Sequence, residues 1–209
     1  MLAPFEICVR MKIDVDGAPN AYGPPGKLTL DYELNAHEYA KPNGEIVGYI
    51  TQPDPQNPSR RIPVVQGPND PYPGYYISRT GFCDVHNSNE LDPRRYVDAS
   101  KINYIVLGDR AFNNQVRLGD FVAVYSVTQK VRVFGIVGDA GNTTGEEGSL
   151  ALLQALGYPF KDGKAGEVEN PEIVVRHFPE SNPQRMFFQT QKQIDDEALK
   201  LQLSKAFAG

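Results

Sequence analysis

An acidic, glycine-rich segment follows one of the most apolar stretches of the chain. An apolar run at 133–137 leads into Asp139, and Glu146 and Glu147 stand before Ser149 and an apolar helical pattern. The apolar run can raise the pKa of Asp139, and N–H groups at the start of a helix can hold Glu147 ionised. Two carboxylates in unlike environments suit acid/base cleavage of a glycosidic bond. The simpler interpretation is a solvated turn carboxylate and a capping glutamate.

A second pair of carboxylates lies at the end of the first strand pattern, in the sequence Asp14-x-Asp16-Gly17. The spacing is similar to the start of a calcium loop, but the acidic pattern stops after its second position. Alternation places Asp14 and Asp16 on the face opposite Ile13 and Val15. From the residues alone, both are interpreted as solvated carboxylates at a strand end.

Other chemical motifs are incomplete. Cys83-x-x-His86 has metal-ligand spacing, but the sequence has no second pair of ligands to complete a site, and His37 and His177 are isolated. No serine lies in a Gly-x-Ser-x-Gly elbow, and no Gly-x-Gly-x-x-Gly follows a strand pattern. We therefore expect neither a metal nor a cofactor. Cys8 and Cys83 form either one disulfide or two buried free thiols.

Aromatic residues gather around a proline-rich loop at 68–74 and the polar stretch after it. Sugar sites present flat aromatic faces, so Tyr75 and Tyr76 are candidates for substrate binding. Tyrosine is also common in strands, which is the simpler interpretation of the same residues.

Short strands dominate the elements that must position these side chains. Alternation and apolar runs predict strands at 5–16, 28–34, 62–66, 75–80, 102–107, 120–127, 131–138 and 173–178. Residues 51–60 are rich in proline and are predicted to lack regular structure. Ser149 and Gly157 bracket a predicted two-turn helix, and a capping box from Thr190 to Gln193 opens a longer one.

Length and composition limit the classes of protein. The chain has 209 residues, a formal net charge of −5 and 40% hydrophobic residues, which predicts one domain with a sizeable core. An acidic chain without a basic stripe is a poor binder of nucleic acid. No apolar run approaches the roughly 18 residues of a membrane helix, and the first residues show no secretory signal pattern.

Five segments in order resemble glycoside hydrolase family 75, the fungal-type chitosanases, over roughly residues 8–182. They begin with Met11-Lys-Ile-Asp-Val-Asp-Gly-Ala-Pro-Asn-Ala-Tyr22, followed by Pro73-Gly-Tyr-Tyr-Ile-Ser78 with the Pro63-Val-Val-Gln66 that precedes it. The others are Tyr96-Val-Asp-Ala99 with Ile102–Leu107, then Gly138-Asp139 with Gly145-Glu-Glu-Gly-Ser-Leu-Ala151, and Phe178-Pro-Glu-Ser181.

The resemblance implies an endo-acting hydrolase that cleaves β-1,4 bonds of chitosan with inversion. Its catalytic Asp and Glu fall on Asp139 and Glu147, although Glu146 also fits the motif in a register shifted by one. Asp14 and Asp16 would pair with substrate ammonium groups. We prefer Glu147 because it keeps Ser149 and the helix in place.

A further likeness, to the core of double-psi β-barrels, implies a mainly β (α+β) fold. It predicts a six-stranded double-psi β-barrel-like core with a short inner helix and a C-terminal helix. Residues 1–189 would form the catalytic domain and 190–209 a helical extension. The family is usually secreted, so the resemblance implies an extracellular protein, and we expect a monomer.

Two other functions stay open: cleavage of peptidoglycan by a glycosidase or lytic transglycosylase, and polysaccharide binding without catalysis, as in expansins. The chain also departs from the family. Arg79 replaces the common threonine after Ser78, and Asn142 stands where proline is expected.

Overall fold

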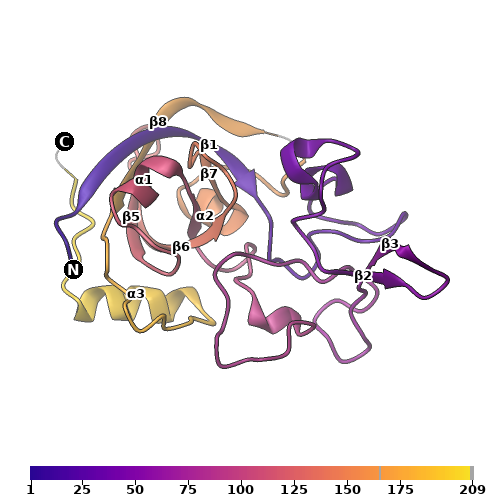
Figure 1. Ribbon diagram of the computed structural model, residues 1–209. Helices are drawn as coiled ribbons and strands as arrows, with labels where there is room; N and C mark the ends of the chain where they lie inside the picture. The colour runs from indigo at the N-terminus through magenta and orange to yellow at the C-terminus, as the bar shows by residue number, and fades with distance from the viewer. Residues whose placement is uncertain (165, 208–209) are drawn as a thin grey trace.

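Six strands close into a barrel in the computed structural model, which describes residues 1–164 and 166–207 (Figure 1). Their order around the barrel is β1-β7-β4-β6-β5-β8. The strands are β1 Phe5–Asp14, β4 Tyr104–Leu107, β5 Phe121–Ser126, β6 Arg132–Ala140, β7 Glu147–Ser149 and β8 Glu167–His177. The mainly β fold with a six-stranded barrel core is therefore confirmed.

Hydrophobic patterning explains which strands lie deepest. Every residue of β5 is buried, whereas β1 alternates between inward and outward side chains along most of its length. Strand β1 pairs antiparallel with β8 and, at its end, parallel with β7, where Lys12 lies opposite Glu147 and Asp14 opposite Ser149. Strand β4 runs parallel to β6. These pairings bring the ends of β1 and β6 toward β7.

The two predicted helices are present. Ser149 accepts a hydrogen bond from the N–H of Leu152 and caps α2, Leu150–Ala155. Thr190 and Gln193 form the expected capping box of α3, Gln191–Lys200. Helix α3 packs against β6 and buries Ile194 in the core that the barrel shares, so the C-terminal segment belongs to the same packed unit. A short helix, α1 (Asp109–Asn113), was not anticipated.

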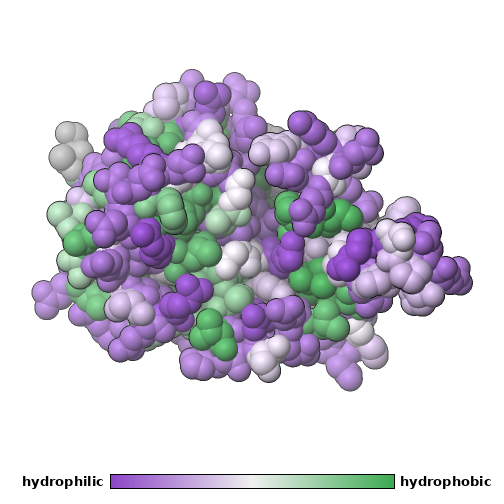
Figure 2. All heavy atoms as spheres, viewed as in Figure 1, coloured by the Kyte–Doolittle hydropathy of each residue, from purple (hydrophilic) through white to green (hydrophobic). Residues whose placement is uncertain are grey.

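The region between β1 and β4 is largely irregular and projects to one side of the barrel (Figure 1). It holds three 3-10 helices, η1 Glu33–Ala36, η2 Glu38–Ala40 and η3 Pro93–Arg95, and a hairpin of β2 Thr51–Asp54 with β3 Asn57–Pro63. Figure 2 shows mostly polar residues over the hairpin.

Three predictions in this region were wrong. Residues 51–60 do form strands, because Pro53 and Pro58 lie in a two-stranded ribbon, where each strand is an edge and tolerates a missing donor. The strand predicted over 28–34 is absent, and η1 begins there instead. The segment 75–80 makes only isolated bridges, through Tyr76 and Ser78.

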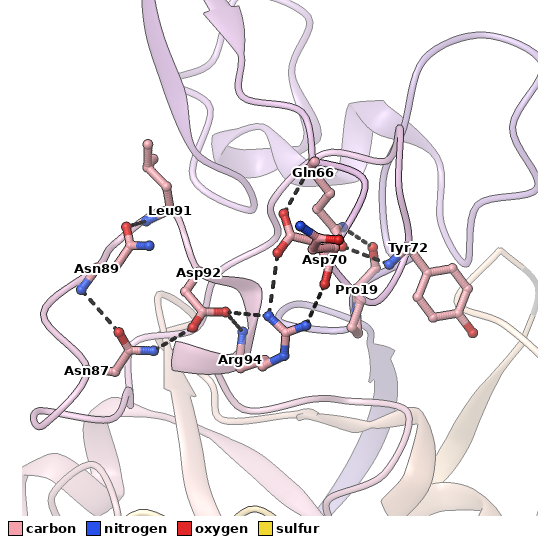
Figure 3. A network of polar contacts seen from close by, with 11 residues as sticks. Pro19, Gln66, Asp70, Tyr72, Asn87, Asn89, Leu91, Asp92 and Arg94 are labelled. Carbon is pink, nitrogen blue, oxygen red and sulfur yellow. Dashed lines mark hydrogen bonds and ion pairs between the residues drawn. The ribbon is translucent and has the colours of Figure 1, made fainter.

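A network of polar contacts joins the loops of this region (Figure 3). The side chain of Arg94 contacts Asp70 and Asp92 and donates to the carbonyl of Asn69 at 2.9 Å. The buried amide of Gln66 donates to the carbonyl of Pro19 and accepts from the N–H of Tyr72. The loop that follows the first strand is thereby fastened to the loop at 66–74.

Near the closure of the barrel, His177 is buried, stacks on Phe5 with ring centroids 5.0 Å apart, and has no hydrogen-bond partner at Nδ1. Burial, helped by the charge of Arg110, lowers the pKa of His177 from 6.5 to about 4. The neutral ring therefore stabilises the fold above the unfolded-state pKa, and this stability is lost as the pH falls through about 4.

We expect the free energy of unfolding of the wild type to fall by about 3 kcal/mol more than that of His177→Phe between about pH 7 and about pH 4. Urea unfolding at both pH values measures the difference. Equal falls for the two proteins would contradict this account of the buried ring.

Candidate functional site

Asp139 lies near the end of β6 and is buried. Its Oδ1 accepts hydrogen bonds from the backbone N–H of Gly81 at 2.6 Å and of Ala140 at 2.7 Å. Burial raises the pKa of this carboxyl to about 7, and the two N–H donors oppose that rise. Asp139 therefore holds a proton over a pH range in which ordinary aspartates are ionised.

Asp14 and Asp16 join Asp139 in one cluster. Each of the three contributes a carboxylate oxygen, and these oxygens lie within 4.8 Å of one another. Burial raises the pKa of both Asp14 and Asp16 well above its usual value, and the neighbouring aspartates raise it further. Both residues are partly buried, and burial dominates their pKa, so the interpretation of them as solvated strand-end carboxylates was wrong.

A tight turn holds Asp16 in this position. Gly17, at φ +78°, donates its N–H to Ser78 Oγ at 2.9 Å, and a Cβ at this glycine would lie 2.0 Å from the carbonyl oxygen of Val97. A residue with a side chain fits neither the dihedral angle nor the space. The turn also lets the N–H of Asp16 donate to Asp14 Oδ1 at 2.8 Å.

Two tyrosines form hydrogen bonds at the cluster, and the sequence analysis did not identify either of them as a site residue. The hydroxyl of Tyr22 donates to Asp16 Oδ1 at 2.7 Å, and that of Tyr104 donates to the Asp16 carbonyl at 2.9 Å. The ring of Tyr104 packs over Gly138, where a Cβ would lie 2.5 Å from the ring. A glycine inside a strand often marks a place where another group approaches the backbone closely. Gly138, just before Asp139, was the feature of the sequence that could have indicated this contact.

The side chains of Glu147 and Glu146 have different neighbours. Glu147 is half-buried, and its charge raises the pKa of both Asp139 and Asp14. Glu146 contacts Arg10 instead, with Oε1 3.5 Å from Nε. The expectation that a helix N-terminus holds Glu147 was wrong, because Glu147 lies in β7 and the side chain of Ser149 occupies the cap.

The tyrosines proposed for sugar binding differ from each other. Tyr76 is only 8% exposed and packs against Tyr49 at 4.9 Å, so it presents no open ring face. Tyr75 is half-buried, lies under the ammonium of Lys27 and donates to the carbonyl of Leu28. Tyr76 is thus a core residue, and the interpretation of it as a sugar platform was wrong.

The cysteines do not form a disulfide: Cys8 and Cys83 are both free, with Cys8 exposed and Cys83 partly buried. Neither contributes to the carboxylate cluster.

The arrangement can store and transfer protons and can face a cation. Three crowded carboxylates favour binding of one or more protons, because ionising all of them places like charges side by side. Among the described residues this cluster is also the grouping whose oxygens could surround a positively charged group. The nearby Glu147 supplies a fourth carboxyl on a separate strand.

No family model and no curated protein matches this chain in sequence. In residues 1–164 and 166–207, none of the helices is both long enough and apolar enough to span a membrane.

Proposed function

We propose that the protein is an endo-acting glycoside hydrolase that cleaves β-1,4 bonds between amino sugars of chitosan, with inversion at the anomeric carbon. The observation that carries this proposal is the buried Asp139, whose pKa is raised to about 7, beside a second carboxyl, Glu147. A protonated and an ionised carboxyl on different strands supply the general acid and the general base that such hydrolysis requires.

Asp139 acts as the acid. It donates its proton to the glycosidic oxygen as the bond from the anomeric carbon to that oxygen breaks. Glu147 acts as the base and removes a proton from water, whose oxygen forms the new bond from the opposite face of the ring. Each carboxyl exchanges one proton, so the protonation states are restored by one proton transfer through solvent. Carboxyl groups of inverting enzymes lie roughly 6.5–9.5 Å apart, which leaves room for the water.

Asp14 and Asp16 bind the substrate ammonium. An ammonium group placed against them replaces repulsion between carboxylates with attraction, which favours a substrate of positive charge over a neutral one. The polymer substrate and the resemblance to secreted chitosanases together support a site of action outside the cell. We expect the protein to act there as a monomer.

Release of new reducing ends from soluble chitosan tests the proposal. We expect the wild type to release them, with the α-anomer formed first, as nuclear magnetic resonance of the fresh products detects. Release from peptidoglycan alone would transfer the activity to that polymer. Binding of polysaccharide without release from any polymer would replace the proposal with an expansin-like binding function.

A further inference from the structure

The three aspartates of the carboxylate cluster are held by different kinds of donor. Asp139 Oδ1 accepts from two backbone N–H groups, and Asp14 Oδ1 accepts from the N–H of Asp16 at 2.8 Å. Asp16 Oδ1 accepts instead from the hydroxyl of Tyr22 at 2.7 Å. Among the described residues, no backbone N–H donates to the carboxylate of Asp16. Asp16 is therefore the member of the cluster whose carboxylate depends on a side-chain donor.

Tyr22 is itself fixed in place. The residue is only 2% exposed, and its ring packs against that of Tyr49 with the centroids 5.7 Å apart. Its backbone carbonyl accepts from the N–H of Tyr76 at 3.0 Å. Burial and the charge of Asp16 raise the pKa of Tyr22 well above its usual value, so the hydroxyl keeps its proton and remains a donor.

A close approach of the backbone also restricts the side chain of Asp16. A Cβ at Gly48 would lie 3.0 Å from Asp16 Oδ1, the same oxygen that accepts from Tyr22. Ser78 Oγ donates to the carbonyl of Gly48 at 2.8 Å and accepts from the N–H of Gly17. The carboxylate is thus oriented by contacts from separate segments before any substrate arrives.

The hydrogen bond from Tyr22 also acts on the charge of Asp16. Ionisable groups from five parts of the chain surround Asp16 or its two partners: Asp14 (β1), Asp31 (the loop after Tyr22), Tyr104 (β4), Asp139 (β6) and Glu147 (β7). Burial and the neighbouring aspartates raise the pKa of Asp16, whereas the hydrogen bond from Tyr22 lowers it. A donor to the charged form favours ionisation, so Tyr22 reduces the cost of a negative charge on Asp16.

We propose that Tyr22 is a positioning residue that orients Asp16 and supports its negative charge, which makes Asp16 the anchor for the ammonium of the substrate. The part that concerns the ammonium rests on the proposed function, whereas the part that concerns Asp16 can be measured on the free protein. Because Tyr22 acts through Asp16, its effect on the substrate should disappear when that carboxylate is replaced.

Carbon NMR of protein labelled at the aspartate carboxyls tests the first part without a substrate. The signal that is absent from Asp16→Asn identifies Asp16. In Tyr22→Phe, which removes only the hydroxyl, we expect the titration midpoint of this signal to rise by about one pH unit. Tyr49→Phe is the matched control, because its ring is a buried neighbour and its hydroxyl donates to Glu33, outside the cluster. It should leave the midpoint unchanged.

Hydrolysis of soluble chitosan tests the second part. We expect Tyr22→Phe to raise KM by roughly tenfold while kcat stays within about threefold of the wild type, because a weaker anchor affects binding more than proton transfer. Tyr49→Phe should keep the wild-type KM. In the Asp16→Asn background, Tyr22→Phe should raise KM no further, since the group through which it acts is absent.

The outcomes separate the two proposals. A midpoint of Asp16 that does not move in folded Tyr22→Phe, or that moves equally in Tyr49→Phe, would overturn the positioning role and leave the hydrolase proposal standing. A KM that Tyr22→Phe raises by the same factor with and without the Asp16 carboxylate would overturn the anchor. No hydrolysis by the wild type would overturn the proposed function and the anchor with it, and the titration would still decide whether Tyr22 supports the charge of Asp16.

A second measurement applies if Tyr22→Phe does not fold by circular dichroism. The wild type is then produced with fluorotyrosine in place of tyrosine, and its more acidic hydroxyl is a stronger donor. Tyr22 is the tyrosine that donates to the carboxylate of Asp16, so the midpoint of Asp16 should fall. An unchanged midpoint would overturn the positioning role.

Discussion

The Asp139→Asn variant is expected to hydrolyse chitosan at least about 1,000-fold more slowly than the wild type while remaining folded. The N–H groups of an amide are far too weakly acidic to protonate a leaving oxygen. It keeps Oδ1 as an acceptor for the N–H groups of Gly81 and Ala140, so the local backbone is preserved. Initial rates of reducing-end release, with circular dichroism of the same samples, measure both parts of this prediction.

The same substitution should stabilise the protein at alkaline pH. The pKa of Asp139 is raised from 3.8 to about 7 in the folded state, chiefly by burial. Its stabilising contribution is therefore complete below the unfolded pKa and is lost as the pH rises through the folded one. At about pH 9 the wild type carries a buried charge that the amide lacks, and the variant should be more stable by on the order of 2–4 kcal/mol.

Urea unfolding at about pH 4 and about pH 9 checks the sign of the effect. The control is Asp196→Asn, which removes an exposed carboxylate from α3 and should change stability by no more than about 0.5 kcal/mol at either pH. An Asp139→Asn variant with near-normal hydrolysis would contradict its role as the acid. A variant that gains no stability at alkaline pH would contradict the raised pKa.

Glu147→Gln is expected to reduce hydrolysis by roughly 100- to 10,000-fold, and Glu146→Gln to leave it within about twofold. The two changes are chemically identical and adjacent in the chain. Only Glu147 acts on the buried aspartates, whereas Glu146 forms a half-exposed contact with Arg10. The pair of variants therefore separates the two registers with one assay.

Added azide distinguishes a lost base from a lost acid. A small anionic nucleophile needs no base, so azide should restore part of the activity of Glu147→Gln and yield an α-glycosyl azide. It should leave Asp139→Asn inactive on chitosan, because the leaving oxygen there still lacks a proton. Rescue of Asp139→Asn instead would exchange the two roles, and an inactive Glu146→Gln beside an active Glu147→Gln would shift the register.

Local signals predicted the elements that carry the site. Ser149 caps α2 and the capping box at Thr190 opens α3, because both depend on residues within one turn. The apolar runs that became β5 and β6 were evident for a similar reason: buried strands need apolar residues at every position. Asp139 could be placed at a strand end on this basis.

Contacts between distant segments could not be predicted. Asp14 and Asp16 occupy positions typical of solvated residues, yet their carboxylate oxygens lie close to that of Asp139, which comes from a distant strand. The contacts of Gly17 with Ser78 and of Asp139 with Gly81 likewise join segments that are far apart in the sequence. The position of Glu147 depends on its pairing with Lys12 across two strands, not on the helix that follows it.

The closure of the barrel sets the order in which the molecule can be made. Strand β1 pairs with β8, and Phe5 lies opposite His177. Because His177 is synthesised roughly 170 residues after Phe5, this pairing can form only late in synthesis. Until then β1 and β5 are open edges, and β1 has a backbone that can pair with another chain. We therefore expect the barrel to close only after β8 has been synthesised, and to close slowly because the pairing joins segments far apart in the sequence.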